Sequence, residues 1–328
     1  MSDVARLAGV SAQTVSRVAA GSKHVRPDTR ERVLRAMNQL GYSPNRAAQA
    51  LRRGSFKTIG VLTQQIQRTG EALTTAGVLE AATAADYAVN LVQVERPASD
   101  DLREAVYRLS HQAIDGLVVV QAGRAGREQL ALPPSMPVAV SDSTLVDYYP
   151  SASADQVGGV RDAVEHLLEL GHRTVHHVCG PEDSQSALIR KATWARTLRE
   201  AGRDVPEAVA GGWEAAAGYE AGLHLATDPE VTAVFCANDE LALGLIRAMH
   251  EQGRRVPADV SVVGFDGLAV GADTFPPLTT VHQDFRRHGR EMVSLVLEQA
   301  TSVPLDGGRS VIIPTELLVR GSTAPPAP

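Results

Sequence analysis

The first residues of this chain whose types and spacing could do chemistry lie on a short polar helix near the N-terminus. Residues 12–18 read Ala-Gln-Thr-Val-Ser-Arg-Val, and helical spacing turns Val15 and Val18 inward. The side chains left on the outer face are those of Ala12, Gln13, Ser16 and Arg17. Gln and Arg carry paired hydrogen-bonding groups that match the edges of adenine and guanine in the major groove. This face favours base recognition, with a solvated helical hairpin as the alternative interpretation.

Two further helices would position this face. A first helix over Asp3–Ala8 ends at Gly9, the residue type best suited to a left-handed turn, and Ser11 is a good N-cap for the second. A third helix begins at Pro27 and runs to Leu40. The apolar residues expected to pack between the three helices are Val4, Leu7, Ala8, Val15, Val18, Val33, Met37 and Leu40.

The charge of the chain is divided unevenly along its length. The 328 residues carry a net charge of −6. Residues 1–53 hold ten Lys and Arg against three Asp and Glu, a net +7, which leaves −13 for the remainder. A basic head on an acidic body suits a protein whose head alone meets a polyanion.

Composition places the protein among soluble globular proteins of the cytoplasm. It is 44% hydrophobic and 21% charged, with no apolar run near 18 residues and no signal peptide. Cys179 and Cys236 each end an apolar strand-like run, so we expect buried thiols in a reducing compartment rather than a disulfide or a metal site.

From Thr58 onward the pattern changes to alternating strands and helices. The predicted strands are Thr58–Thr63, Ala88–Val94, Gly116–Val120, Val138–Val140, Thr174–Cys179, Thr232–Cys236 and Val260–Phe265. The predicted helices between them include Gly77–Asp86, Asp100–Leu109, Val160–Leu170 and Leu241–Gln252. Nearly continuous apolar strands joined by helices predict an α/β fold of parallel sheets covered on both faces. Seven strands are too many for one compact sheet, and two lobes with a cleft between them fit the pattern better.

Polar and aromatic side chains gather just after these strands, where open parallel sheets bind ligands. The candidates for this binding site are Gln64, Arg190, Trp213, Asn238, Asp266, Gln283 and Phe285. Carboxylates and amides pair with hydroxyl groups, and a flat ring covers the apolar face of a sugar. Several of these residues also have a simpler interpretation, since Asn238 and Asp239 could be helix caps, Asp266 a turn residue, Arg190 a surface residue and Trp213 plain core.

No catalytic set is visible. The chain has no G-x-S-x-G, P-loop, H-E-x-x-H or C-x-x-C motif. The only histidine cluster, His176-His177, alternates along a strand, which sends the two side chains to opposite faces and disfavours a shared metal. We therefore expect no enzyme activity, no cofactor and no metal.

Five motifs in order make the chain resemble the LacI/GalR family of bacterial transcription repressors over essentially its full length. They are Asp-Val-Ala-Arg-Leu-Ala-Gly-Val-Ser…Thr-Val-Ser-Arg-Val, Leu-Gly-Tyr-Ser-Pro-Asn-Arg-Ala-Ala-Gln-Ala-Leu, Glu-His-Leu-Leu-Glu-Leu-Gly-His-Arg, Ala-Asn-Asp-Glu-Leu-Ala-Leu-Gly and Asp-Val-Ser-Val-Val-Gly-Phe-Asp. The resemblance implies a helix-turn-helix head, a hinge helix, and a core like the periplasmic sugar-binding proteins. It also implies a homodimer that binds palindromic double-stranded operator DNA and responds to a small ligand.

The family pattern, laid on this chain, predicts its domain boundaries. They are 1–44 for the head, 45–56 for the hinge helix and linker, 57–320 for the effector-binding and dimerisation core, and 321–328 for a disordered tail. Within the core, the N-lobe would take about 57–152 and 285–312, and the C-lobe about 153–284 and 313–320. The tail has no coiled coil, so we expect a dimer.

The same resemblance implies roles for individual residues. Ala12, Gln13, Ser16 and Arg17 would lie on the recognition helix, and His24, Thr29, Tyr42 and Asn45 would approach phosphates or adjacent bases. Leu51 would wedge into a central minor-groove step and kink the duplex. Arg190, Trp213, Asn238, Asp266, Gln283 and Phe285 fall where the family keeps ligand contacts, which favours a galactoside-like or other sugar effector over a purine.

The chain departs from the family pattern at several positions. Met1-Ser2 replaces the usual start of the first helix, so that Ser2 could serve as its cap, and Arg26 replaces the usual Ser cap of the third helix. A cleft aspartate is replaced by Ala139, for which Asp142 could compensate, and Gly267 stands where a second acid often follows Asp266. These changes leave the identity of the sugar open.

These observations predict a ligand-responsive repressor of sugar-utilisation genes, released from its operator by a sugar. The alternative is a sugar-binding receptor without a role on DNA, against which the basic head and the absence of a signal peptide argue. A third interpretation, an enzyme using Asp266 and Arg190, lacks a nucleophile.

Overall fold

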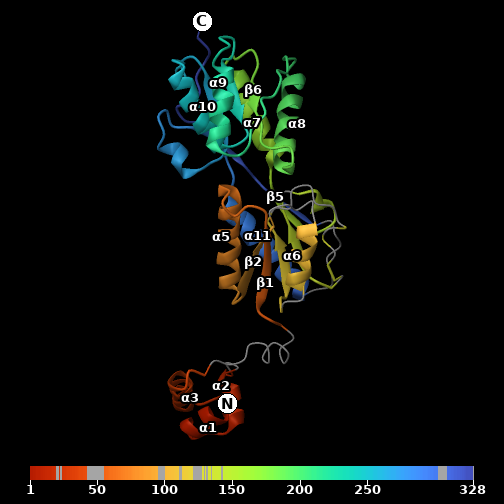
Figure 1. Ribbon diagram of the computed structural model, residues 1–328, viewed down its shortest axis with the longest axis vertical. Coiled ribbons are helices and arrows are strands. Elements are labelled where there is room, and N and C mark those ends of the chain that lie inside the picture. Colours follow the sequence, from red (N-terminus) through yellow and green to blue (C-terminus); the bar gives the residue numbers. More distant parts are fainter. Residues whose placement is uncertain are drawn as a thin grey trace. The chain divides into compact units, whose positions relative to one another are not determined.

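The computed structural model describes the chain except for residues 20–21, 23, 43–54, 95–99, 111–112, 121–127, 129, 131, 134, 142, 302–308 and 328, and the side chains of residues 100 and 110. It separates into two compact units, Met1–Lys57 with Ala113–Asp115, and Thr58–Gln112 with Gly116–Pro328. Helices α1 to α3 make up the described secondary structure of the first unit, and the second alternates strands and helices (Figure 1).

The first unit holds α1 (Ser2–Ala8), α2 (Ala12–Ala19) and α3 (Pro27–Gln39). Gly9 ends α1 in the left-handed conformation with φ 63° and ψ 41°, and the Ser11 hydroxyl accepts from the backbone N–H of Thr14 at 3.1 Å. Because these two features close α1 and open α2 within three residues, the helices fold back on one another. Their shared core is Val4, Ala5, Ala8, Val15, Val18, Val33, Ala36 and Met37.

Three expectations for this unit are wrong. Leu7 is 48% exposed and Leu40 46% exposed, whereas both were expected in the core. Ala5 takes the inward position on α1, and the helix α3 stops at Gln39, which leaves Leu40 as its exposed C-cap. Ser2 is the first helical residue and not the cap, because Met1 occupies the N-cap position. Arg26 precedes α3 without a side-chain cap, as expected.

The first lobe of the second unit contains a six-stranded sheet in the order β10-β5-β4-β3-β1-β2, with every neighbouring pair parallel. Its strands are β1 (Thr58–Thr63), β2 (Ala88–Gln93), β3 (Gly116–Val119), β4 (Val138–Val140), β5 (Ser151–Ala154) and β10 (Ser310–Ile313). Its helices are α5 (Thr69–Ala84), α6 (Asp100–Ser110) and α11 (Phe285–Thr301), with a 3-10 turn at Thr144–Asp147. Helices α5 and α11 pack together on one face, where Val78 and Met292 meet Ile59, Val61 and Val118.

The second lobe contains a five-stranded sheet in the order β11-β9-β8-β7-β6, in which only β11 is antiparallel to its neighbour. Its elements are β6 (His176–Val178), β7 (Ala233–Cys236), β8 (Ser261–Asp266), β9 (Thr279–His282), β11 (Glu316–Leu318), α7 (Gln156–Glu169), α8 (Gln185–Glu200), α9 (Ala215–Leu225), α10 (Asp239–Glu251) and a 3-10 turn at Ala269–Ala272. Strand alternation is plain in β7, where Val234 and Cys236 pack under α9 and α10 while Ala233 and Phe235 pack under α7 and α8.

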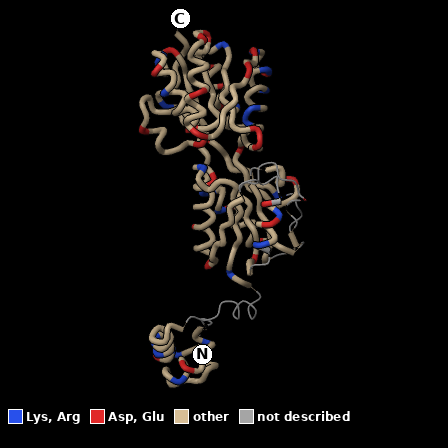
Figure 2. The backbone as a smooth tube through the Cα atoms, viewed as in Figure 1, with Lys and Arg blue, Asp and Glu red and all other residues tan. Residues whose placement is uncertain are grey.

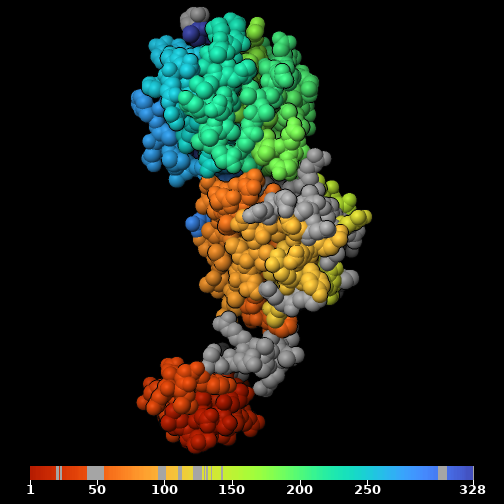
Figure 3. Space-filling model, viewed as in Figure 1, coloured from red at the N-terminus to blue at the C-terminus, as the bar shows by residue number. Residues whose placement is uncertain are grey.

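The chain passes between the lobes three times, at residue 155, at residues 283–284 and at residues 314–315. The lobes are therefore each discontinuous in sequence, and the space-filling view shows the green to light-blue lobe and the orange to yellow lobe as separate masses (Figure 3). The seven predicted strands all occur, with ends that differ by up to two residues. The predicted set lacks four of the observed strands, β5, β9, β10 and β11, since β5 reads Ser-Ala-Ser-Ala, β9 is only four residues long, and β10 and β11 are short edge strands.

The C-terminal segment is held against β8 at residues 322–324, although its composition predicts disorder. The Ser322 hydroxyl donates to the carbonyl of Val262 at 2.6 Å, and the Val262 N–H donates to the carbonyl of Ser322 at 2.8 Å. The carbonyl of Ala324 accepts from Ser261 and contacts His172 Nε2. Backbone pairing along β8, which composition does not reveal, fixes the small residues of this segment.

Candidate functional site

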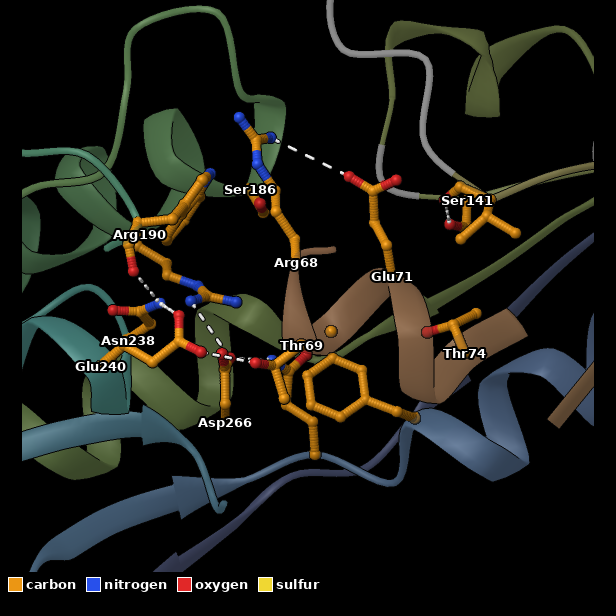
Figure 4. Close-up of a pocket in the computed structure, with 15 residues that line it drawn as sticks. Arg68, Thr69, Glu71, Thr74, Ser141, Ser186, Arg190, Asn238, Glu240 and Asp266 are labelled. Atoms are coloured by element: carbon orange, nitrogen blue, oxygen red, sulfur yellow. Dashed lines mark hydrogen bonds and ion pairs between the residues drawn. The ribbon is translucent and has the colours of Figure 1, made fainter. Parts of the chain in front are cut away.

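A cavity that is partly open to solvent takes its lining from both lobes (Figure 4). Its lining residues are Arg68, Thr69, Gly70, Glu71, Thr74, Val120, Ser141, Ser186, Arg190, Trp213, Asn238, Glu240, Asp266, Gln283 and Phe285. Most of them follow the carboxyl ends of parallel strands or begin the next helix, where the strand-end rule for open sheets places ligands. Aromatic rings and convergent polar groups in a concave site are typical of small-molecule binding.

Arg190 lies at the centre of the second-lobe wall and is 4% exposed. Its Nε donates to Gln156 Oε1 at 2.8 Å, its Nη1 donates to the Ala237 carbonyl, and Nη1 lies 3.5 Å from Asp266 Oδ1. Gln283 connects the other side, since its amide donates to Asp266 Oδ1 at 2.7 Å and its carbonyl accepts from Gln156 at 3.2 Å. The four side chains form a closed ring, which holds the guanidinium and the carboxylate in place at the cavity.

Aromatic rings flank this ring of polar groups. The Arg190 guanidinium carbon lies 3.9 Å from the centroid of Phe265 and 5.5 Å from that of Trp213. Asn238 serves as N-cap of α10, accepting from the Leu241 N–H at 2.9 Å, while its amide donates to the Trp213 carbonyl at 3.0 Å. Asn238 is therefore a helix cap, and it also lines the cavity.

Two carboxylates beneath this wall have raised pKa values. Burial raises the pKa of Asp266 to about 6 even though Arg190 beside it favours the charged form. Burial, and then the charge of Asp266, raise the pKa of Asp239 to about 7. Asp239 is fully buried and accepts from Thr280 Oγ1 at 2.5 Å and the Leu268 N–H at 2.6 Å. Asp239 and Asp266 therefore titrate as a coupled pair, and the net charge of the pair changes near neutral pH.

The first-lobe wall is also polar. Glu71 is 5% exposed, and its Oε2 accepts from the Thr63 hydroxyl and from the N–H groups of Gln64 at 2.9 Å and Gln65 at 2.8 Å. Burial raises its pKa, and these donors oppose that effect. Arg68 Nη1 lies 3.9 Å from Glu71 Oε1. These contacts hold a carboxylate against the cavity from the first turn of α5 (Figure 4).

Six of the seven side chains proposed from the sequence line this cavity, namely Arg190, Trp213, Asn238, Asp266, Gln283 and Phe285. Gln64 lies outside its lining and instead contributes its backbone N–H to Glu71. The lining residues that the sequence reasoning missed in the first lobe are Arg68, Thr69, Gly70, Glu71, Thr74, Val120 and Ser141, and those in the second lobe are Ser186 and Glu240. Most of the first-lobe group begins α5, eight residues before the helix start expected at Gly77.

Gly267, a departure from the family pattern, has a structural reason. Its φ is +71°, and a Cβ built there would lie 2.6 Å from the Cα of His282. Asp266 itself has φ 117°, a conformation that costs energy for a residue with a side chain. At the end of β8 the backbone therefore lies too close to His282 for an acidic residue at position 267. Asp142 lies outside the described residues.

On the helical unit, α2 presents the face expected to meet DNA. Ala12, Gln13 and Arg17 are exposed and Ser16 is half-buried, while Val15 and Val18 are buried. His24 is exposed, whereas Thr29 and Tyr42 are half-buried, and Tyr42 packs against the core of the unit. Asn45 and Leu51 lie outside the described residues. Figure 2 shows Lys and Arg positions spread over this unit beside few acids.

Comparison with known proteins decides the family. Residues 1–45 match the family described as bacterial regulatory proteins, lacI family, and residues 164–323 match the periplasmic binding protein-like domain. The chain is 35% identical to the lactose operon repressor of Escherichia coli (strain K12) over 99% of this chain and 90% of that protein. The chain belongs to the lacI family of bacterial regulatory proteins. The family expected from the five motifs is confirmed, as are the helix-turn-helix head and the core like the periplasmic binding proteins.

This lacI-family chain is also 32% identical to the HTH-type transcriptional regulator CelR of Thermobifida fusca, over 97% of this chain and 96% of the relative. Its structure is similar to that of the lac repressor dimer bound to operator and the anti-inducer ONPF, with a TM-score of 0.89 and 34% identity over 98% of both chains. The complex of the regulator CelR with cellobiose matches with a TM-score of 0.74 and 30% identity over 98% of both chains.

Three further findings concern the described part of this lacI-family protein. Cys179 and Cys236 are both free and buried, as expected. No helix there is long and apolar enough to cross a membrane. The same residues contain no group of three or more His, Cys, Asp or Glu that could hold a metal ion.

Proposed function

We propose that this protein is a repressor that binds a palindromic operator as a homodimer, and that a sugar entering the cavity releases it. The observation that carries the proposal is the lining of the cavity, which draws on Arg68, Glu71 and Phe285 in one lobe and on Arg190, Trp213 and Asp266 in the other. A ligand that contacts both walls stabilises one arrangement of the lobes over others. Such a ligand can therefore act as an effector.

The DNA side of the proposal rests on α2. Gln13 and Arg17 stand one turn apart on its exposed face, and side chains of these types discriminate bases at about 1–3 kcal/mol each. The net +7 of residues 1–53 supplies the attraction to phosphates. The similar lac repressor structure is a dimer bound to operator, and a dimer would place two α2 helices on neighbouring half-sites. Leu51 would take part as the hinge wedge.

The effector side rests on the chemistry of the cavity. Paired carboxylate, guanidinium and amide groups beside Trp213 and Phe285 suit hydroxyl groups and the apolar face of a sugar ring. The similar solved structures include a lac repressor bound to ONPG and a CelR–cellobiose complex. A galactoside is therefore a leading candidate for the sugar, within a wider class of mono- and disaccharides.

The test begins by selecting bound sequences from a pool of random duplexes with the full-length protein. We expect an inverted repeat to emerge, with an affinity that falls by about 0.9 log units per log unit of salt for each phosphate neutralised. A screen of mono- and disaccharides by thermal shift then identifies ligands, since a binder at 100 times its Kd adds about 2.7 kcal/mol. The identified sugar should release the selected duplex.

Two outcomes contradict the proposal. If the protein prefers no inverted repeat over random duplex, with or without sugars, it is not a repressor, and the result favours a sugar receptor. Leu51→Ala should weaken operator binding and leave sugar affinity intact, and unchanged operator binding would contradict the hinge role of Leu51.

A further inference from the structure

The first-lobe wall of the cavity holds a carboxylate oxygen that is buried and has no hydrogen-bond partner among the residues that the structure describes. This oxygen is Glu71 Oε1. The other oxygen of the same carboxylate, Oε2, accepts from Thr63, Gln64 and Gln65. Three donors on one oxygen fix the orientation of the carboxylate, so that the second oxygen remains available at the cavity.

A second unpaired polar atom belongs to the same wall. Arg68 Nε is buried without a hydrogen-bond partner in the described part of the chain, and Arg68 Nη1 is 3.9 Å from Glu71 Oε1, beyond hydrogen-bond length. Arg68 Nε therefore remains an unpaired donor and Glu71 Oε1 an unpaired acceptor on the same wall, and the guanidinium of Arg68 offsets the charge of Glu71. Because the pair is close to neutral in sum, it favours an uncharged ligand group over an ammonium ion.

The opposite wall repeats this arrangement. Arg190 and Asp266 also combine a guanidinium with a carboxylate, at 3.5 Å. The cavity therefore has a carboxylate and guanidinium pair in each lobe, with Thr74 and Ser141 adding hydroxyl groups to the first-lobe lining (Figure 4). Hydroxyl groups both donate and accept hydrogen bonds, so a ligand with hydroxyl groups at both ends matches the carboxylate and guanidinium pair of each lobe.

We propose that Glu71 is a specificity-determining residue that accepts a hydrogen bond from an effector hydroxyl, and that the effector is hydroxylated at both ends. This inference rests on the proposed function and narrows its ligand class. A sugar with a second hydroxylated unit, or a free sugar, satisfies Glu71 and Arg68. An apolar aglycone against this wall would leave Glu71 Oε1 and Arg68 Nε buried without hydrogen-bond partners.

The experiment compares matched ligands by isothermal titration calorimetry on the full-length protein. For galactose and for glucose, in α and β linkage, the probes are the free sugar, the phenyl glycoside and the disaccharide in which the phenyl group is replaced by glucose. We expect the better of the two hydroxylated ligands to bind about tenfold to 100-fold more tightly than the phenyl glycoside, as hydrogen bonds to a charged group imply.

Two variants and a control locate the effect. Glu71→Leu should abolish the preference or reverse it in favour of the phenyl glycoside, and Glu71→Gln, which keeps the shape and still folds if Leu does not, should reduce it at least threefold. Glu80→Gln, an exposed position on the same helix α5, should retain the wild-type ratio. Circular dichroism confirms that each variant is folded.

The outcomes separate this inference from the proposed function. If a sugar binds and releases operator but the phenyl glycoside binds as tightly, or the Glu71 variants keep the wild-type ratio, the role of Glu71 is wrong and the repressor stands. If no sugar binds at all while operator binding is intact, both the sugar effector and this inference are overturned.

Discussion

Thr69 and Glu240 join the two lobes beside the cavity. The Thr69 hydroxyl, at the start of α5, donates to Glu240 Oε1 in the first turn of α10 at 2.5 Å. Glu240 Oε2 in turn accepts from the Asn238 amide at 3.4 Å, which connects this bridge to the cap of α10. Both residues line the cavity, so a ligand and this bridge act on the same arrangement of the lobes.

Thr69→Val should weaken operator binding in the absence of ligand. The variant keeps the shape of the side chain but removes the donor to Glu240, which lowers the population of the arrangement seen here by the value of one charge-assisted hydrogen bond. This arrangement resembles that of a lac repressor bound to operator. We expect a loss of about threefold to tenfold in operator affinity, measured by fluorescence anisotropy, together with release at lower sugar concentration.

The matched control is Thr69→Ser, which keeps the hydroxyl and should behave like the wild type. Equal operator affinity and equal sugar response in Thr69→Val and the wild type would show that the bridge has no part in the switch.

Sugar affinity should depend on pH through Asp266. Burial raises the pKa of Asp266 to about 6, so its carboxylate, the form that accepts from ligand hydroxyls, is lost as the pH falls through that value. We expect affinity to be constant above pH 7 and to decrease by up to tenfold per pH unit below about pH 6. Calorimetric titrations with the identified sugar from pH 5 to pH 8 measure this profile.

Asp266→Asn provides the control for this profile, since an amide keeps an acceptor oxygen beside Arg190 but does not titrate near pH 6. Its affinity should be lower at pH 8 and flatter below pH 7. A variant profile with the same slope as the wild type would assign the titration to another group, such as Asp239.

The second-lobe wall could be predicted from the sequence because its residues follow directly after strands. Asn238 and Asp266 come within two residues of the ends of apolar runs, and the carboxyl ends of neighbouring parallel strands meet at one edge. Arg190 lies on the helix that follows another such strand end. Local periodicity was sufficient to place these groups together.

The first-lobe wall could not be predicted in this way. Arg68 and Glu71 lie several residues beyond β1. Arg68 is the N-cap of α5 and Glu71 lies in its first turn, and this helix has no side-chain cap hydrogen bond and no apolar stripe to mark its start. Gln64 directly follows the end of the strand, but its contact with Glu71 is made by its backbone N–H. The ordered C-terminus also depends on contacts between residues about 60 positions apart, such as Ser322 with Val262.

Replacing Gln13 or Arg17 should change the sequence preference of the protein, whereas losing a phosphate contact should weaken binding to all sequences alike. Arg17→Ala and Gln13→Ala should each cost about 1–3 kcal/mol on the selected operator and relax the preference at one base pair of each half-site. Selection from random duplexes, repeated with each variant, measures the preference.

Arg35→Ala is the matched control, because Arg35 is exposed on α3, outside the α2 face, and its loss should weaken binding to all sequences alike or leave it unchanged. If Arg17→Ala reduces affinity equally for operator and random duplex, Arg17 contacts phosphate and the base assignment is incorrect.

His177 should make the core sensitive to acid. Its ring stacks on that of Phe235, with 5.0 Å between the ring centroids, and its centroid lies 5.1 Å from that of Trp194. Its Nδ1 pairs with the Phe235 carbonyl at 2.9 Å, and its buried Nε2 has no partner among the described residues. A proton on Nε2 would be buried without an acceptor, and burial lowers the pKa of His177 to about 4. Since the unfolded chain takes up this proton near pH 6.5, the contribution of His177 to stability falls between pH 6.5 and pH 4, by roughly 3 kcal/mol.

His177→Phe removes this titration and keeps an aromatic ring between Trp194 and Phe235. Asp239 and Asp266 titrate in the same range with the opposite sign, because carboxyl groups with raised pKa values stabilise the fold as the pH falls. The measurement is therefore the difference in unfolding free energy between variant and wild type, from urea titrations at several pH values. The variant should be less stable at pH 8, where the Phe235 carbonyl loses its donor, and the difference should shrink as the pH approaches 4. A difference that stays constant from pH 8 to pH 4 would mean that His177 accepts its proton in the folded protein as readily as in the unfolded chain.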